Sequence, residues 1–481
     1  MLTGQAAALY AGPAIVISFL IAGFAATMAA LCYAEMASMI PVAGSAYTYA
    51  YATMGELVAW IIGWDLILEY LVGAATVAVG WSGYFCALLH DAFGIYINPA
   101  VTQAPFGFDS HAQMFRLTGA VINLPACFIV LAVTFVLVIG IQESARMNNI
   151  AVIIKLVVII LFILVALPRV SMDHWTPFIP PNQGTFGAFG VSGIFQGASL
   201  VFFAYIGFDM VSTTAQECKN PQRDLPIGIM FSLAICTVLY ILVALALTGL
   251  VPYTDLNVAH PIAVAIEATG LQWMTVLVEF GAVAGLTSVL LVLLMGQPRI
   301  FYAMAKDGLL PPYFAHIHPR YRTPVATTLF SGFVCSILAA VLPIDVLGEL
   351  TSIGTLFAFF LVCLAIPILR HRKPNAPRRF RVPFGPHLIP FTGAGSSLIL
   401  IFTAPGHTVA RLFIWMAVGC GVYFLYGIRH SKLRLFPKDT FDSIPVIDRT
   451  EEMTVYSPYA SRALVNDAHG DLSMISLEAL K

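Results

Sequence analysis

The stretch Phe202–Asp209 (FFAYIGFD) places a glycine and an acid in the middle of an apolar segment. That segment, 187–216, has about 30 residues, more than the ~20 that cross a bilayer as a helix. Unwound backbone at membrane depth occurs only where protein or a water-filled cavity covers it. A break at this stretch would therefore direct free carbonyl and amide groups at a bound polar solute. A continuous helix, in which Gly207 only lets a neighbour pack closely, is an equally open alternative.

A single lysine, Lys155, lies eight residues into the apolar run Asn148–Leu167. A charge inside a spanning helix is unfavourable and usually functional. Because burial favours the neutral form of an amine, Lys155 is a candidate for reversible proton binding. In the alternative interpretation, its long stem extends to the cytoplasmic surface and has a structural role only.

Two acids, Asp65 and Glu69, are spaced four residues apart and so share one helix face. In a spanning helix this face must point towards the protein interior. The pair either lines an inner water pathway or forms a hydrogen-bonded scaffold.

The composition of the whole chain indicates how such groups are positioned. Of 481 residues, 59% are hydrophobic and 10% are charged, which excludes an ordinary soluble protein and predicts an all-α polytopic membrane protein. The net charge of −1 gives no indication of nucleic-acid binding. The eight cysteines form no CxxC pair and no metal-binding spacing, and no nucleotide-binding or hydrolase motif occurs. We therefore expect no cofactor, no metal and no enzymatic activity.

Eleven apolar runs are bounded by turn or charged residues. They cover 12–39, 50–89, 118–140, 147–167, 187–216, 225–250, 272–303, 323–343, 346–369, 385–403 and 407–428. The residues from 429 to 481 are polar and are expected to form a tail without a fixed fold.

Basic residues indicate the orientation. All but four of the 24 lysines and arginines fall on one side when the chain is run back and forth through these spans. Arg116, Arg169 and Arg411 fall on the other side, and Lys155 lies within the membrane. The positive-inside rule makes the basic side cytoplasmic, so we expect an integral protein of the cytoplasmic membrane with a cytoplasmic C-terminus. The basic block 370–381 is either a topology determinant or a contact for anionic lipid.

Three motifs in order resemble the cationic amino acid transporter family of the amino acid–polyamine–organocation superfamily. The first is Phe202–Asp209 with the following VSTTAQECKNPQRDLP. The second is Tyr33–Ser38 (YAEMAS) with Pro41–Tyr49 (PVAGSAYTY), and the third is Gly296–Pro311 (GQPRIFYAMAKDGLLP). The resemblance extends from residue 1 to about residue 430.

The resemblance implies a leucine-transporter-like fold of two five-helix inverted repeats, followed by two extra helices. The transmembrane domain would be 1–428, with repeats at 1–167 and 187–369, extra helices at 385–428 and a cytoplasmic tail at 429–481. The family's glycine-rich first helix has no counterpart after Met1. We therefore expect the first repeat to lack most of its opening helix, leaving eleven spans.

The resemblance also implies roles for particular residues. The substrate would contact the break at Phe203, Ala204, Ile206, Gly207 and Asp209, with Phe203 as an aromatic lid. The side-chain pocket would draw on Val79, Gly83, Tyr240 and Leu293. Lys155 would replace a sodium ion, and Thr287 and Ser288 match positions whose hydroxyls would otherwise hold that ion.

These implications together predict a secondary transporter that moves amino acids across the bilayer by alternating access, coupled to protons. A bulky Leu293 would shorten the pocket and disfavour long cationic substrates, unless it faces lipid or another helix. Two alternatives stay open, a truncated form that does not transport and a transporter of polyamines or other organic cations.

Overall fold

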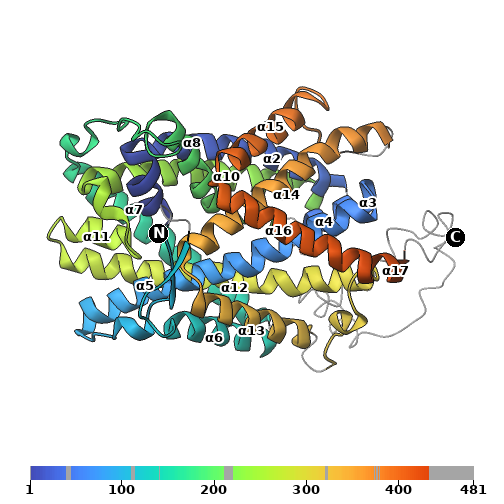
Figure 1. The fold of residues 1–481 in the computed structure, drawn as a ribbon, viewed down its shortest axis with the longest axis horizontal. Coiled ribbons are helices and arrows are strands. Elements are labelled where there is room, and N and C mark those ends of the chain that lie inside the picture. Colours follow the sequence, from blue (N-terminus) through green and yellow to red (C-terminus); the bar gives the residue numbers. More distant parts are fainter. Residues whose placement is uncertain are drawn as a thin grey trace, which may run out of the picture.

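The structure of the chain is a computed structural model. It describes residues 2–39, 45–109, 114–139, 141–210, 220–319, 323–372 and 380–432, together with Pro374 and Arg378. Most of the predicted tail therefore lies outside the described residues. The long helices run roughly along the longest axis of an elongated bundle (Figure 1).

Seven helical segments are long and apolar enough to cross a membrane. They are Leu2–Met39, Glu56–Phe93, Asn148–Arg169, Arg223–Leu250, Gln272–Lys306, Ile344–Arg372 and Gly406–His430. Four shorter apolar helices are Leu124–Ile139, Gly190–Tyr205, Val325–Val341 and Leu388–Thr403. Each predicted apolar run overlaps one of these segments. Large apolar side chains also cover the outside of the bundle, as a lipid-facing surface requires. These features confirm a polytopic, nearly all-helical membrane protein.

The first segment is interrupted near its start. It consists of α1 (Leu2–Ala6), a π-helical turn (Ala7–Ala11), a 3₁₀ turn (Gly12–Ala14) and α2 (Ile15–Met39). Gly12 has a φ of 61°, and a Cβ at this position would lie 2.6 Å from the ring of Pro180. Only glycine fits there, because both the backbone angle and the close contact exclude a side chain.

The second predicted run, 50–89, is divided at Gly55, which has a φ of 103°. A short helix α3 (Ser45–Thr53) precedes this glycine. The spanning segment follows it as α4 (Glu56–Ile67), a π-helical turn (Leu68–Val72) and α5 (Gly73–Phe93). The apolar pattern continues through Gly55, so it did not reveal the turn.

A short hairpin departs from the all-α prediction. Strands β1 (Phe106–Asp109) and β2 (Met114–Leu117) pair antiparallel, with Phe106 opposite Leu117. The Phe108 ring lies 4.8 Å from the ring of His407 and 4.6 Å from the guanidinium of Arg411. These contacts hold the hairpin against α16 (Gly406–Val422).

The remaining helices complete the bundle. They are α6 (Leu124–Ile139), α7 (Ile141–Ala166), α8 (Gly190–Val201), α10 (Pro221–Leu250), α11 (Pro261–Glu267), α12 (Gln272–Lys306), α13 (Val325–Val341), α14 (Ile344–Arg372), α15 (Leu388–Thr403) and α17 (Ile428–His430). Two helices organise the packing, since α2 contacts α8, α10, α14 and α15, and α12 contacts α5, α7 and α13.

Candidate functional site

The helix that begins with α8 is broken at the predicted stretch. After Val201 the chain forms a 3₁₀ turn, Phe202–Tyr205, and Ile206 is extended with a ψ of 138°. Gly207 has a φ of 113°, a conformation that glycine adopts readily and other residues do not. A Cβ at Gly207 would meet no atom of the described residues within 4 Å, so among these residues the glycine faces open space. The predicted loss of regular helix at Phe202–Asp209 is confirmed, whereas the rest of the predicted span, 211–216, lies outside the described residues.

The protein itself uses part of the hydrogen-bonding capacity that the break exposes. The Tyr240 hydroxyl on α10 donates to the Ala204 carbonyl over 2.7 Å. The Ile206 amide donates to the Phe203 carbonyl over 3.2 Å. A carbonyl oxygen has two lone pairs, so each of these groups can accept a further hydrogen bond in addition to the one shown. The break therefore offers fewer free acceptors than unwinding alone predicts.

Aromatic contacts anchor the two ends of the break. Phe202 and Phe208 both pack against Phe359 of α14, with ring centroids 5.6 and 4.9 Å apart. The Tyr205 hydroxyl donates to the Phe19 carbonyl of α2 over 2.9 Å. In contrast, Phe203 is half-buried and makes no ring contact with another described aromatic side chain. Its ring is therefore less restrained than its neighbours.

Asp209 closes the break with a fully buried carboxylate, which accepts a 2.7 Å hydrogen bond from the Tyr70 hydroxyl. Tyr70 lies in the π-helical turn Leu68–Val72, and such turns are frequent at functional sites. The protein thus engages Asp209, and its contact with a solute stays a prediction.

Glu69 belongs to the same π-helical turn, and Asp65 precedes it on α4. Both side chains are fully buried, and Glu69 lies close enough to Thr355 and Asp209 to interact with both. A Cβ on Gly354 of α14 would lie 3.2 Å from Asp65 Oδ1, so the pair faces the interior. This confirms that the two acids point inward.

The other predicted pocket residues have separate surroundings. Val79 is half-buried, and Gly83 packs against Ala259 in the loop before α11. The buried Leu293 lies beside Gly73 at the start of α5. Their shared role in a substrate pocket stays a prediction.

The loop beside Gly83 continues into His260, which lies edge-on to the Tyr84 ring at 6.3 Å. Burial lowers the pKa of His260, while Asp91 and Glu267 act in the opposite direction. Burial therefore favours the neutral form of the imidazole.

The predicted coupling residues meet where α7 packs on α12. A Cβ on Gly285 would lie 3.3 Å from Lys155 Cβ and from Lys155 Cδ, so the lysine stem lies along this glycine. Lys155 has no hydrogen bond or ion pair with any described residue. Thr287 and Ser288 follow Gly285 by two and three residues. The structure thus brings the stem of Lys155 to the helical turn that carries both hydroxyls.

Both hydroxyls already have protein partners. Thr287 Oγ1 accepts from Trp81 Nε1 over 2.9 Å and donates to the Val283 carbonyl over 2.7 Å. Ser288 Oγ donates to Asn148 Oδ1 of α7 over 2.6 Å. The sequence did not point to Trp81 or Asn148. The spacing of seven residues between Asn148 and Lys155, which places them on one helix face, is the signal that was available.

A buried ion pair was also missed. Glu35 at the end of α2 is fully buried and accepts from Arg370 Nε over 2.9 Å and from the Val382 amide over 2.7 Å. Arg378 Nε lies 3.4 Å from the same carboxylate. Two arginines of the 370–381 block therefore bind an acid of the protein, whereas the sequence predicted a topology determinant or a lipid contact.

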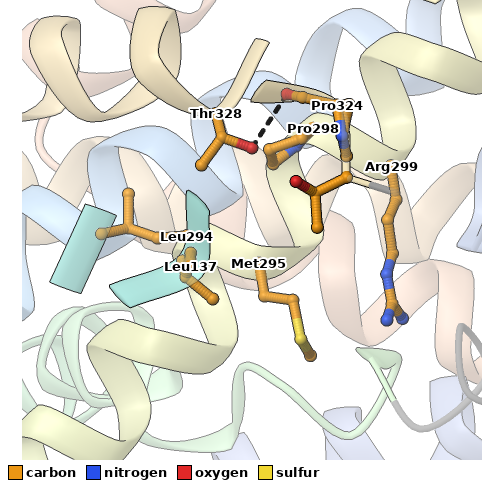
Figure 2. Close-up of a pocket in the computed structure, with 8 residues that line it drawn as sticks. Leu137, Leu294, Met295, Pro298, Arg299, Pro324 and Thr328 are labelled. Carbon is orange, nitrogen blue, oxygen red and sulfur yellow. Dashed lines mark hydrogen bonds between the residues drawn. The ribbon is translucent and has the colours of Figure 1, made fainter. Parts of the chain in front are cut away.

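Two cavities lie away from the break. One of ≈ 20 Å³, about the size that holds one water, lies between α6, α12 and α13 beside Leu137, Met295 and Thr328 (Figure 2). In it, the Thr328 hydroxyl donates to the Pro324 carbonyl over 3.0 Å. The other, of ≈ 470 Å³, is lined by Tyr10, Gln196 and His407 among others. Neither lining includes a residue of Phe202–Asp209.

Comparison with known proteins matches residues 1–424 to the family described as amino acid permease. The chain is 45% identical over 434 residues to the branched-chain amino acid permease BcaP of Bacillus subtilis (strain 168), covering 90% of each chain. It is 44% identical over 433 residues to the methylthioribose transporter of the same organism, again covering 90% of each. It is 37% identical over 377 residues to human cationic amino acid transporter 4, covering 78% of this chain and 57% of that protein.

Proposed function

Because the chain belongs to the amino acid permease family and is an amino acid transporter, we propose that it is a secondary transporter coupled to protons through Lys155. The observation that carries this proposal is the position of Lys155. Its half-buried side chain lies against Gly285 of α12, in the helical turn that carries Thr287 and Ser288, and no described acid forms an ion pair with it. A cation in such surroundings is poised to lose and regain its proton as access alternates.

The substrate, in this proposal, binds at the break of Phe202–Asp209. Gly207 faces the open space, and the Ile206 carbonyl and the remaining lone pairs of Phe203 and Ala204 accept from the substrate ammonium. Phe203 closes over the bound molecule. Tyr240 holds the backbone of the break in the conformation that binds.

We propose amino acids with short or branched apolar side chains as substrates. The support is the bulky, buried Leu293, which would shorten a pocket that Val79 and Gly83 also line. The relative with 45% identity is named for branched-chain amino acids, which agrees with this substrate class. Polyamines and other organic cations are the alternative, and the relative named for methylthioribose adds a neutral thio-sugar as a competitor to test.

Transport would proceed by alternating access of two inverted repeats, 1–167 and 187–369, in the cytoplasmic membrane, with a cytoplasmic C-terminus. The break and Lys155 then lie in different repeats. Movement of one repeat against the other would couple the protonation of Lys155 to the opening of the substrate site.

Purified protein in proteoliposomes tests this function. Radiolabelled leucine should accumulate when the outside is more acidic than the inside, and excess leucine should compete better than lysine, putrescine or methylthioribose. Lys155→Ala should lose accumulation driven by the pH gradient and keep exchange of labelled for unlabelled leucine. Accumulation that is still driven by the pH gradient in Lys155→Ala would refute coupling through this lysine.

A further inference from the structure

We propose that Asn148 and Trp81 are positioning residues, which orient the hydroxyls of Ser288 and Thr287 so that both present lone pairs, and no proton, to the ammonium of Lys155 when it reaches them. The inference rests on the proposed coupling role of Lys155. It adds two residues, on α7 and α5, that no motif assigned.

Three contacts define the register of α7 against α12. Gly281 faces Val158, Gly285 faces Lys155, and Ser288 bonds to Asn148. Residues of increasing number along α12 therefore contact residues of decreasing number along α7. The two helices are antiparallel at this seam. The α12 residues are small, which lets the backbones approach closely. At Gly281 and Gly285 an added Cβ would lie 2.7 and 3.3 Å from α7 side chains.

The direction of the lysine follows from helix geometry. Side chains on a helix lean towards its N-terminus and cover the preceding turn. On α7 that direction leads from Lys155 towards Asn148, two turns earlier. Ser288 lies three residues past Gly285, in this same direction along the seam. The lysine stem is thus directed along the seam towards the helical turn that carries Ser288, although its ammonium forms no hydrogen bond with a described residue in this structure.

The hydrogen bonds that the two hydroxyls already form determine which further partners they can bind. A hydroxyl has one proton to donate and two lone pairs that accept. Ser288 donates its proton to Asn148 Oδ1, and Thr287 donates its proton to the Val283 carbonyl. Trp81 Nε1 also occupies one lone pair of Thr287.

What remains is two lone pairs on Ser288 and one on Thr287. These lone pairs stabilise a cation. They cannot donate a hydrogen bond to the nitrogen lone pair of a neutral amine. Asn148 and Trp81 therefore favour the ammonium form of Lys155 without supplying a charge. A carboxylate in their place would bind the ammonium more tightly and hinder proton release.

Among the described residues, neutral groups surround Lys155, so stabilising its ammonium depends on them. From α10, the Cys236 thiol is the titratable group that interacts with Lys155. From α12, the facing residues Gly281 and Gly285 carry no charge. Described acids form no ion pair with the lysine.

The test is Asn148→Asp in proteoliposomes, with radiolabelled leucine uptake measured from pH 5 to pH 9. Aspartate still accepts the Ser288 proton, so the packing is kept, but its charge stabilises the ammonium of Lys155. The midpoint of uptake against pH should rise by about one unit or more. Asn149→Asp is the matched control, because Asn149 is the exposed neighbour on α7 and should leave the midpoint unchanged.

Two further variants keep the proposal falsifiable if Asn148→Asp does not fold. Ser288→Ala removes the oriented hydroxyl, and Trp81→Phe removes the Nε1 donor. Each should reduce uptake driven by the pH gradient at least five-fold relative to leucine exchange in the same preparation. A purely structural role would reduce both activities in proportion.

The outcomes separate this inference from the proposed function. If Lys155→Ala loses accumulation driven by the pH gradient, but Asn148→Asp keeps the wild-type midpoint, coupling stands and the positioning role is wrong. The same holds if Ser288→Ala and Trp81→Phe lower both activities equally. If Lys155→Ala retains accumulation driven by the pH gradient, the coupling proposal fails, and this inference fails with it.

Discussion

The hydroxyl of Tyr240 donates a 2.7 Å hydrogen bond to the carbonyl of Ala204, joining α10 to the broken helix. Leaving a part-buried carbonyl without its hydrogen-bond partner lowers stability by about 1–3 kcal/mol. We expect Tyr240→Phe to keep the packing of the ring and to loosen the break. The KM for leucine uptake should rise about five- to tenfold, as this free energy allows.

Tyr313→Phe is the control for Tyr240→Phe, because Tyr313 is 67% exposed in the turn after α12. It should transport like the wild type. A Tyr240→Phe protein with wild-type KM would show that this hydrogen bond does not hold the binding conformation.

Gly207 and Gly228 provide a second test, because a Cβ at either position would meet no atom within 4 Å in the part of the chain that the structure describes. They differ in backbone angle, since Gly207 has a φ of 113° and Gly228 lies within α10. Gly207→Ala should therefore lower the free energy of unfolding by about 1–3 kcal/mol and impair uptake. Gly228→Ala should be neutral or stabilise by up to ~1 kcal/mol.

Thermal unfolding of the purified proteins in detergent, together with leucine uptake, checks this pair. Because steric clash is absent at both glycines, a difference between the variants reports backbone strain alone. Equal behaviour of the two would mean that the break tolerates an ordinary helical residue at 207.

Phe203 is half-buried in the 3₁₀ turn and, unlike Phe202, has no described aromatic partner. A ring that covers bound substrate should contribute to affinity, so Phe203→Ala should weaken leucine binding more than tenfold, about 1.4 kcal/mol. Phe203→Tyr keeps the ring and should bind like the wild type. Phe231→Ala, at a 67% exposed position of α10, controls for loss of a lipid-facing ring. An unchanged binding isotherm for Phe203→Ala would place the lid elsewhere.

The break and the position of Lys155 were predictable because each contradicts a local rule. Gly207 and Asp209 are out of place in an apolar helix, and so is Lys155. A residue that contradicts its surroundings is visible in sequence whatever lies across from it. The family resemblance then connected Lys155 with Thr287 and Ser288, which lie more than 130 residues later.

The partners of these groups were not predictable in the same way. Nearly uniform apolar helices carry little periodic signal, so they reveal neither which face meets which helix nor the register of contact. Asn148 and Trp81 look like ordinary helix residues until α7 and α5 are placed against α12. The π-helical turn at Leu68–Val72 and the hairpin at 106–117 likewise depend on tertiary packing, which overrides local propensity.

The ion pair of Glu35 with Arg370 shows this limit most clearly, because 335 residues separate its two members. Read alone, Glu35 is one acid at a helix end and Arg370 belongs to a basic loop. In the fold, Arg370 binds the carboxylate through two nitrogens, and Arg378 and the Val382 amide approach the same group. This arrangement ties the end of α2 to the segment between α14 and α15.

Removing the charge of Glu35 should therefore destabilise the protein strongly. Glu35 is fully buried, and the side chains of Arg370 and Arg378 are 17% and 4% exposed. Breaking a buried pair by removing one partner leaves an uncompensated charge and lowers stability by about 3–5 kcal/mol. We expect Glu35→Gln to lower the melting temperature by several degrees, measured by thermal unfolding in detergent.

Arg429→Gln, at an exposed position of α17, is the matched control and should leave the melting temperature unchanged. A double-mutant cycle with Glu35→Gln, Arg370→Gln and the double variant isolates the interaction free energy of the pair. In the double variant, no charged Arg370 is left without its counterion. The interaction free energy should be about 1–3 kcal/mol. Additive single effects would contradict the pairing and would attribute the loss in Glu35→Gln to the other partners of this carboxylate, Arg378 and the Val382 amide.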